Sequence, residues 1–193
     1  MQQRDWSKIP KNQVFKGRVI NRDGQPVVAA KITPGAMSPI QLLESIALTD
    51  ENGEFEIASK NRTDKVQLII SGKGYTKTVT PEMKFKAKRQ EISITRGAFL
   101  KGTILKDGKP VKGIQMGLCQ ENRTKLFVGE YIIGTNDKGE FLFSNLPPRQ
   151  SYYLYGKMNS MQGIGVIPFR KVLSGIDDAV TDAGEMKSTK GFN

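Results

Sequence analysis

Histidine is absent from this 193-residue chain, and cysteine and tryptophan occur once each. Without histidine there is no Ser-His-Asp or Cys-His triad, no His-ligated zinc and no imidazole that changes charge near neutral pH. The single cysteine, Cys119, excludes an intramolecular disulfide and a metal site built from several cysteines. These absences exclude the commonest hydrolase and zinc chemistries, and we expect neither a cofactor nor an enzymatic activity.

Long apolar runs are missing as well. No stretch approaches the ~18 to 20 apolar residues that span a bilayer, so no transmembrane segment is predicted. The N-terminal residues MQQRDW lack the apolar core of a secretory signal peptide, and no such signal is visible in the chain. Hydrophobic residues make up 37% of the chain, which suffices for modest cores and exceeds what a disordered chain contains.

The charge is strongly basic, with 30 Lys and Arg against 19 Asp and Glu and a net charge of +11. This balance favours acidic partners such as anionic glycans, membrane or cell-wall surfaces and, as the less expected partner, nucleic acid. The densest basic run contains Lys84, Lys86, Lys88 and Arg89. On an extended strand its three lysines would share one face, opposite Phe85. Such lysines either protect an exposed edge strand from aggregation or form a polyanion-binding site.

An internal repeat is the strongest pattern in the sequence, and a repeat decides the architecture. Residues 14–27 read VFKGRVINRDGQPV, and residues 99–111 read FLKGTILKDGKPV. Further along each copy, TDENGEF at 49–55 matches TNDKGEF at 135–141, at nearly the same spacing. Asp-Gly between apolar runs predicts a hairpin turn, and Asn-Gly or Lys-Gly before Glu-Phe predicts a second one. Phe55 and Phe141 are expected to point inward.

Alternating apolar and polar residues predict short strands throughout. Besides the strands that open the two copies, the expected strands are 27–32, 45–48, 55–58, 75–79 and 90–95, then 111–118, 126–134, 141–143, 152–157 and 163–169. A helical turn is expected at 39–44. This pattern predicts an all-β protein of two tandem Greek-key β-sandwich modules of the Ig-like or transthyretin-like type. The expected layout is an extension at 1–12, modules at 13–97 and 98–188, and a tail at 189–193.

The repeated motifs resemble those of the carboxypeptidase regulatory-like family, also described as transthyretin-like or prealbumin-like modules. The matching residues of the first copy are Gly17, Val19, Asp23, Gly24, Pro26, Val27, Ala30, Ile32, Thr49, Asp50, Gly53, Phe55, Gly74 and Tyr75. Those of the second copy are Gly102, Ile104, Asp107, Gly108, Pro110, Val111, Gly113, Thr135, Gly139 and Phe141. The second copy departs from the family pattern at Asn136, where the family has Asp, and lacks the Gly-Tyr turn.

The resemblance implies a module without zinc ligands of its own. Related modules occur mostly in secreted or cell-envelope proteins of bacteria, as repeats beside enzymes, receptors or adhesins. It therefore implies an extracellular or envelope location, further flanking domains and a non-enzymatic role, either as a spacer or as a binding surface for protein, peptide or glycan. Polyanion binding through the basic first copy is the alternative.

The densest aromatic stretch is a second candidate site. Along a strand, Tyr153 and Tyr155 share one face, whereas Tyr152 and Leu154 share the other. One face belongs to the core, and the other either packs as well or offers a stacking platform for sugar or peptide. Cys119 is expected to be half-buried on a strand.

Two groups of acidic residues are expected to be structural, without a metal-binding or catalytic role. The segments 50–53 and 136–139 lack the spacing of an EF-hand calcium loop and are expected to be plain turns. The cluster of Asp177, Asp178, Asp182 and Glu185 lacks evidence of the fixed separation that paired catalytic carboxylates need. We expect it to form a solvated turn and closing strand, with no metal site.

Overall fold

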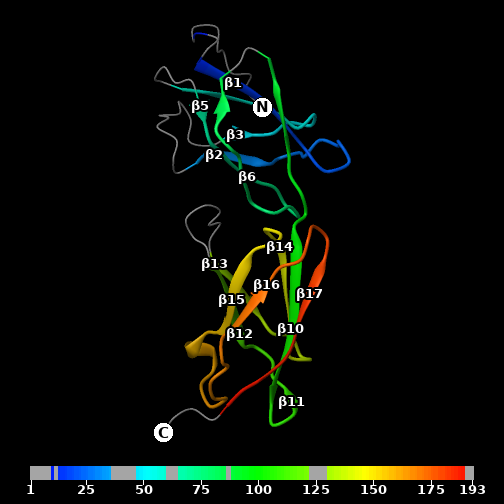
Figure 1. Cartoon of the computed structure of the whole chain (residues 1–193), viewed down its shortest axis with the longest axis vertical. Helices are drawn as coiled ribbons and strands as arrows, with labels where there is room; N and C mark the ends of the chain where they lie inside the picture. The colour runs from blue at the N-terminus through cyan, green and yellow to red at the C-terminus, as the bar shows by residue number, and fades with distance from the viewer. Residues whose placement is uncertain are drawn as a thin grey trace. The chain divides into compact units, whose positions relative to one another are not determined.

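The computed structural model describes residues 10, 13–35, 47–59, 65–85, 88–121 and 130–189. The chain divides into two compact units, Met1–Thr95 and Arg96–Asn193 (Figure 1). Nearly every element of both units is a β-strand, which confirms the predicted all-β class. The family-specific module ranges predicted above remain a prediction.

The described residues of the first unit form three sheets. One sheet has the order β4 (Glu54–Ala58), β1 (Val14–Ile20), β9 (Gln90–Ser93), in which β1 is antiparallel to β4 and parallel to β9. A second sheet has the order β3 (Ala47–Leu48), β2 (Lys31–Pro34), β6 (Leu68–Ser71), β7 (Thr78–Val79). The third is the pair β5 (Lys65–Val66) and β8 (Met83–Lys84). Apolar side chains of the first two sheets form one core, including Phe15, Phe55, Ile57, Ile32, Leu68 and Ile70.

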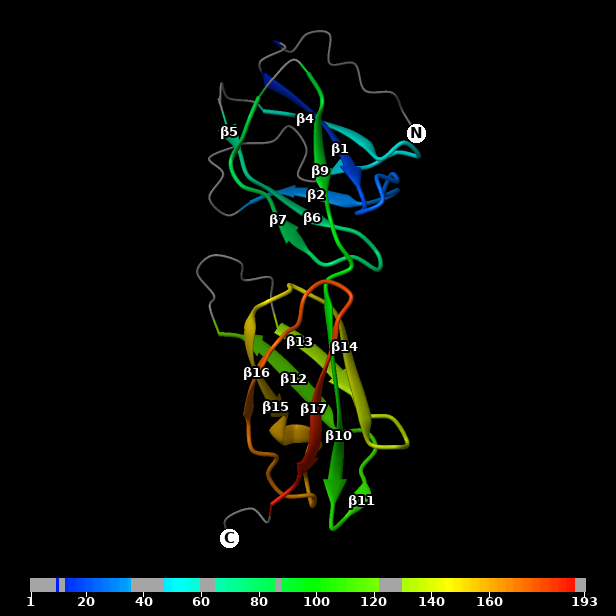
Figure 2. The same cartoon turned by 45° about the vertical axis from the view of Figure 1, so that its right-hand side comes forward.

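The described residues of the second unit form two four-stranded sheets, whose strands are labelled in Figures 1 and 2. In one, β10 (Ala98–Lys106) pairs with β11 (Lys109–Pro110), β14 (Glu140–Leu146) and, in parallel, β17 (Val180–Lys187). The other has the order β13 (Glu130–Gly134), β12 (Gln115–Gln120), β15 (Ser151–Gly156), β16 (Arg170–Leu173). Their facing sides share a core that includes Leu100, Ile104, Phe141, Phe143, Leu118, Tyr152 and Leu154. Each unit is thus a β-sandwich.

The repeated glycine and phenylalanine of each copy form a close contact inside the core. Gly17 lies opposite Phe55 in the β1–β4 register, and Gly102 lies opposite Phe141 in the β10–β14 register. A Cβ at Gly17 would lie 2.3 Å from the Phe55 ring, and one at Gly102 would lie 2.5 Å from the Phe141 ring. Only glycine leaves room for these rings, which explains why both residues recur together.

A buried threonine connects the two layers in each copy. The Thr49 hydroxyl donates to the carbonyl of Val27 (2.6 Å) and accepts from the N–H of Ala30 (2.8 Å). In the second copy the Thr135 hydroxyl donates to the carbonyl of Val111 (2.7 Å) and accepts from the N–H of Ile114 (3.0 Å). Both threonines therefore hold the segment that crosses from the first strand of a copy into the other sheet.

The repeated acidic turn is also structural. An Asp50 side-chain oxygen accepts from the N–H groups of Asn52 (2.9 Å) and Glu54 (2.8 Å). The Asn136 side-chain oxygen accepts from those of Lys138 (2.9 Å) and Glu140 (2.9 Å). Because both bonds need only an oxygen acceptor, Asn136 performs the same role in the second copy as Asp50 does in the first. The segments 50–53 and 136–139 are turns, as predicted.

Several strand boundaries differ from the prediction. The strand expected at 27–32 begins only at Lys31, because Ala29 has φ +55° in the segment held by Thr49. The strand expected at 111–118 begins only at Gln115, after Gly113 with φ +79°. Periodicity continues through these crossing segments, so it does not reveal where pairing begins.

The strand expected at 163–169 is wrong. Gly163 and Gly165 have positive φ (+73° and +103°), and this stretch makes only a single bridge, from Val166 to Thr189. The strand lies further on, as β16, and the 3-10 helix η2 (Met158–Ser160) was not predicted. The helical turn predicted at 39–44 and parts of the strands predicted at 45–48 and 126–134 lie outside the described residues.

Removing either threonine hydroxyl is expected to destabilise its own unit. Thr49→Val and Thr135→Val keep the side-chain volume but leave a buried carbonyl and N–H without their partner, which costs about 1–3 kcal/mol. Thr49→Ser and Thr135→Ser keep the hydroxyl and serve as matched controls. Urea unfolding of the four variants measures the difference, and valine variants as stable as the serine variants would contradict the assignment.

The equivalence of Asp50 and Asn136 gives a second prediction. Asp50→Asn is expected to leave the free energy of unfolding nearly unchanged, because the oxygen acceptor remains. Asp50→Ala removes both turn hydrogen bonds and is expected to lose about 0.5–2 kcal/mol, as the loss of an N-terminal helix cap of the same chemistry does. Chemical denaturation distinguishes the two; an equally destabilised asparagine variant would show that the charge itself matters.

Candidate functional site

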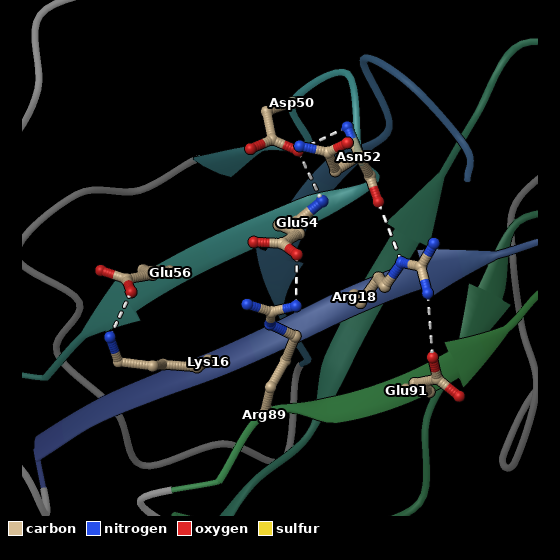
Figure 3. Close-up of polar contacts among 8 residues, drawn as sticks. All are labelled: Lys16, Arg18, Asp50, Asn52, Glu54, Glu56, Arg89 and Glu91. Carbon is tan, nitrogen blue, oxygen red and sulfur yellow. Dashed lines mark hydrogen bonds and ion pairs between the residues drawn. The ribbon is translucent and has the colours of Figure 1, made fainter.

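The outer face of the β4-β1-β9 sheet is a ladder of ion pairs (Figure 3). The pairs join Lys16 to Glu56 (2.5 Å), Arg18 to Glu91 (3.2 Å) and Arg89 to Glu54. The Arg18 side chain also donates to the backbone carbonyl of Asn52 (3.0 Å). Exposed pairs of this kind stabilise a fold by only about 0–1 kcal/mol each, but every basic group in this ladder has an acidic partner.

The basic run at 84–89 is divided by the fold. Lys84 is exposed at the end of β8, Lys88 is exposed in a bend, and Lys86 lies outside the described residues. Phe85 points inward and packs edge-on against Phe15, 5.8 Å between ring centroids. Since β8 ends at Lys84, the run is not one extended edge strand. Arg89 is matched by an acid, whereas Lys84 and Lys88 have no acidic partner among the described residues.

The aromatic stretch alternates as predicted. Tyr152 and Leu154 are fully buried in the core, whereas Tyr153 and Tyr155 are half-buried on the outer side of β15. The Tyr152 hydroxyl donates to the carbonyl of Pro147 (3.2 Å). Burial raises the pKa of Tyr152 well above its usual range, and burial raises the pKa of Tyr131 to about 12. The inward tyrosines are thus neutral core residues.

Tyr153 is fixed by a charged cluster at the surface. Its hydroxyl donates to a carboxylate oxygen of Glu121 (2.9 Å), and the Lys171 ammonium donates to the same oxygen (2.6 Å). Lys171 and then Tyr153 lower the pKa of Glu121, and the hydrogen bond to Glu121 raises the pKa of both its partners. The Tyr153 ring also meets Phe169 edge-on, with 5.9 Å between centroids. Its orientation is therefore set before any ligand arrives.

Tyr155 covers a glycine on the neighbouring strand. Gly117 lies opposite Tyr155 in the β12–β15 register, and a Cβ there would lie 2.3 Å from the ring. The ring therefore lies against the backbone of β12, and any larger residue at position 117 would displace it. This contact gives Tyr155 a packing role, and the residue is half-buried.

Exposed apolar side chains extend the surface around these tyrosines. Phe169 is 72% exposed, Leu173 63% and Ile132 47%, although all three are large apolar residues. The registers Ser151↔Leu173 and Gly117↔Ile132 place Leu173 and Ile132 on the same side of the sheet as the two outer tyrosines. We define the aromatic face as Tyr153, Tyr155, Phe169, Leu173 and Ile132.

Most of the aromatic face was not visible in the sequence. Only the tyrosines were predicted, because only they are neighbours along the chain. Phe169 fell in a wrongly predicted strand, and Glu121 and Lys171 reach Tyr153 through cross-strand register. One signal for the rest of the face was available in the sequence. Leu173 lies two positions after Lys171 and so shares its side of a strand.

A shallow hollow of about 400 Å³ lies on the outer side of the other sheet in the second unit. Its lining includes Lys101, Thr103, Asn136, Glu140, Leu142 and Asp182. Asp182 accepts from the N–H of Gly184, which with the Lys101 ammonium at 3.4 Å lowers the pKa of this carboxyl group. The Glu140 carboxylate accepts from the Asn136 amide (3.0 Å). Both carboxylates thus already have partners within the fold.

A metal-binding group and a membrane-spanning helix are both absent from the part of the chain that the structure describes. No group of three or more Cys, Asp or Glu residues there is placed to hold a metal ion. Asp178 faces Arg96 (3.6 Å) and Asp182 faces Lys101, so the acidic residues at 177–185 do not converge. Nor is any helix there long and apolar enough to cross a membrane. Cys119 lies half-buried on β12, as predicted.

No protein-family model and no curated protein matches the chain. Among solved structures it is similar to the Bacillus anthracis TIE protein, at 13% identity and a TM-score of 0.39 over 92% of this chain and 34% of that one. It is also similar to a Streptococcal ancillary pilin, at 14% identity and a TM-score of 0.40, over 92% and 63% of the two chains. It is similar as well to the shaft pilin SpaA from Lactobacillus rhamnosus GG, at 8% identity and a TM-score of 0.42, over 94% of this chain and 99% of that one.

The chain thus spans about a third of the first of these proteins and less than two thirds of the second. At such low identities the likeness does not extend to what those proteins do.

The cluster around Glu121 predicts a measurable titration. Tyr153 is expected to ionise at a higher pH than an ordinary tyrosine, because its hydroxyl donates to a carboxylate that stays charged. Glu121→Gln removes that charge and is expected to lower the pKa of Tyr153 towards the ordinary value. A pH titration of ¹³C-labelled tyrosine rings by NMR measures it, with Tyr155→Phe as the control that leaves the cluster intact. An unchanged Tyr153 titration in Glu121→Gln would disprove the contact in solution.

Proposed function

We propose that this chain is a non-enzymatic interaction module of the carboxypeptidase regulatory-like type, belonging to a bacterial cell-envelope or secreted protein. Its binding surface is the aromatic face, and the ligand is a protein segment with apolar side chains. The envelope or extracellular setting, and further domains flanking this piece, are proposed from the resemblance of its repeated motifs to that family.

The observation that carries the proposal is the exposed aromatic face itself. Three large apolar side chains that are 47–72% exposed lie on the same side of the sheet as Tyr153, whose hydroxyl donates to Glu121 and whose ring contacts Phe169. Exposed apolar surface is typical of interaction sites, and aromatic residues are enriched at their centres. The aliphatic Leu173 and Ile132 favour apolar protein side chains over sugars, which need more hydrogen-bonding groups around the rings.

The repeated residues support a non-catalytic role. Their threonines, glycines, phenylalanines and Asp50 or Asn136 make the same internal contacts in both copies. The motifs on which the resemblance rests therefore serve the fold. The ion-pair ladder of the first unit and the aromatic face of the second lie on outer faces, away from these shared contacts.

Polyanion binding through the first copy stays the alternative function. The net charge of +11 and the exposed Lys84 and Lys88 favour it, and Lys86 adds to the same run. The ion pairs of Lys16, Arg18 and Arg89 weaken it, because a phosphate or sulfate would have to displace a carboxylate from each.

A binding screen against peptides, glycans and nucleic acid at about 0.15 M salt tests the proposal, since that ionic strength screens nonspecific attraction. We expect a peptide ligand whose affinity falls at least about tenfold in Phe169→Ala and in Tyr153→Ala, as for a central aromatic contact. Lys84→Ala with Lys88→Ala is the matched control and should bind as the parent does. Peptide binding lost in the lysine variant, or found for polyanions alone, would overturn the proposal in favour of the alternative.

A further inference from the structure

The two copies differ in how they connect two corresponding strands, β6 and β7 in the first unit and β15 and β16 in the second. In the first unit this connection is residues 72–77, and Tyr75 within it packs against the core. In the second unit it is residues 157–169, which include η2. We call residues 157–169 the β15–β16 loop. It is the longer of the two connections, and it stands where the first copy has its Gly-Tyr turn.

The β15–β16 loop is anchored to the second unit. Two of its apolar side chains, those of Met161 and Ile167, are buried in the core of the unit. The Lys106 ammonium, at the end of β10, donates to the loop carbonyl of Gly163 (2.7 Å). These contacts fix the backbone of the loop, so the side chains that point away from the core are held at the surface.

Two other apolar side chains of the loop lie in solvent. Met158 is 85% exposed, and Val166 is 46% exposed. No residue of η2, which begins at Met158, is buried. An apolar side chain left in water adds almost nothing to the stability of a fold, so these two residues do not serve the core. Single exposed apolar residues are common, and their surroundings decide what they can bind.

The surroundings of the loop are strongly basic. β11, η2 and the last described residues lie at the same end of the second unit in both views (Figures 1 and 2). The segments that form this end are 106–114, the β15–β16 loop and 187–189. Their charged residues are Lys106, Lys109, Lys112, Lys157 and Lys187, with Asp107 as the one acid. Only Lys112 has an acidic partner among the described residues, Asp137 (2.6 Å). This end of the unit therefore carries an uncompensated positive charge.

Hydrogen bonds join the lysines and the exposed apolar residues into one surface. Val166 and Thr189 exchange two backbone hydrogen bonds (2.8 Å each), which places Val166 beside the segment that begins at Lys187. Lys106 and Lys109 lie directly opposite each other across the β10–β11 hairpin. Like charges in that position destabilise a hairpin, so this lysine pair does not serve the fold. We define the basic end as Lys109, Lys157, Lys187, Met158 and Val166.

We propose that the basic end binds the surface of an anionic lipid membrane. The lysine ammonium groups attract phosphate-bearing headgroups, and the side chains of Met158 and Val166 enter the interface below them. Binding of this kind strengthens with the apolar area buried and with the charge attracted, and the basic end supplies both. A soluble polyanion would use the lysines alone and leave the two apolar side chains in water. The inference is independent of the aromatic face, which lies on the outer side of the β13-β12-β15-β16 sheet.

Co-sedimentation of the full chain with lipid vesicles tests the proposal. Vesicles of phosphatidylcholine with about 30% phosphatidylglycerol supply the anionic surface, and vesicles of phosphatidylcholine alone are the comparison. At about 0.1 M salt, where the attraction is only partly screened, the chain is expected to sediment with the anionic vesicles and not with the neutral ones. A chain that stays in solution with both, or that binds both equally, would overturn the proposal.

Charge reversal locates the site. Lys109→Glu with Lys187→Glu is expected to lower the partition coefficient at least about tenfold, because each lysine near an anionic surface contributes about fivefold. Lys84→Glu with Lys88→Glu in the first unit makes the same change in net charge and is the matched control, which should bind nearly as the parent does. An equal loss in both variants, or a loss in the control alone, would contradict binding through the basic end. Circular dichroism of each variant verifies the fold.

The apolar pair distinguishes a membrane from a soluble polyanion. Met158→Ser with Val166→Ser is expected to lower the partition coefficient at least about threefold, because less apolar area is buried. Ile176 is 57% exposed at the opposite end of the same unit, where Phe99 donates to the carbonyl of Ala179 near the start of β10. Ile176→Ser is therefore the matched control and should leave binding unchanged. Undiminished binding of the double serine variant would overturn the membrane assignment in favour of a soluble polyanion.

A fluorophore reports insertion directly. With Cys119→Ser as background, Met158→Cys carries an environment-sensitive dye, and Ile176→Cys carries the same dye as the control. The dye at position 158 is expected to shift its emission to shorter wavelength with anionic vesicles, because it leaves water for the headgroup region. No shift at position 158, or equal shifts at both positions, would overturn the proposed insertion of the basic end.

Discussion

The buried threonine hydroxyl is the interaction on which each copy depends. The segment between the first strand and the opposite sheet contains a residue with positive φ, Ala29 in one copy and Gly113 in the other, and this residue lies outside the strands. Thr49 and Thr135 provide both a donor and an acceptor at this point. Because the segment crosses between layers, its anchoring lets the two sheets face each other and bury one core.

Comparison of the two copies distinguishes the residues that both need for the fold from the residues that differ between them. Gly17 and Gly102 both make room for a phenylalanine, and neither copy departs from that contact. On the outer faces the two copies diverge. Glu56, which follows Phe55 in the first copy, corresponds to Leu142, which follows Phe141 in the second. The two copies therefore share these internal contacts and differ at corresponding positions on their outer faces.

The sequence predicted the fold class and the inward phenylalanines well, because short-range periodicity and turn residues determine them. It predicted the alternation of Tyr152 and Tyr153 for the same reason. It did not predict where β2 and β12 begin, since a crossing segment has the same periodicity as a strand. The aromatic face depends on which strands become neighbours, and pairing between segments far apart in the chain leaves no local signal.

Amide hydrogen exchange tests the role of the threonine hydroxyls most directly. The N–H groups of Ala30 and Ile114 are bonded to side-chain oxygens rather than to a strand, and loop amides without a firm partner exchange quickly. The account predicts that both amides exchange only when their unit unfolds, as slowly as the central amides of β1 and β10. Exchange of either amide at the rate of the exposed turns at Gly24 and Gly108 would contradict it.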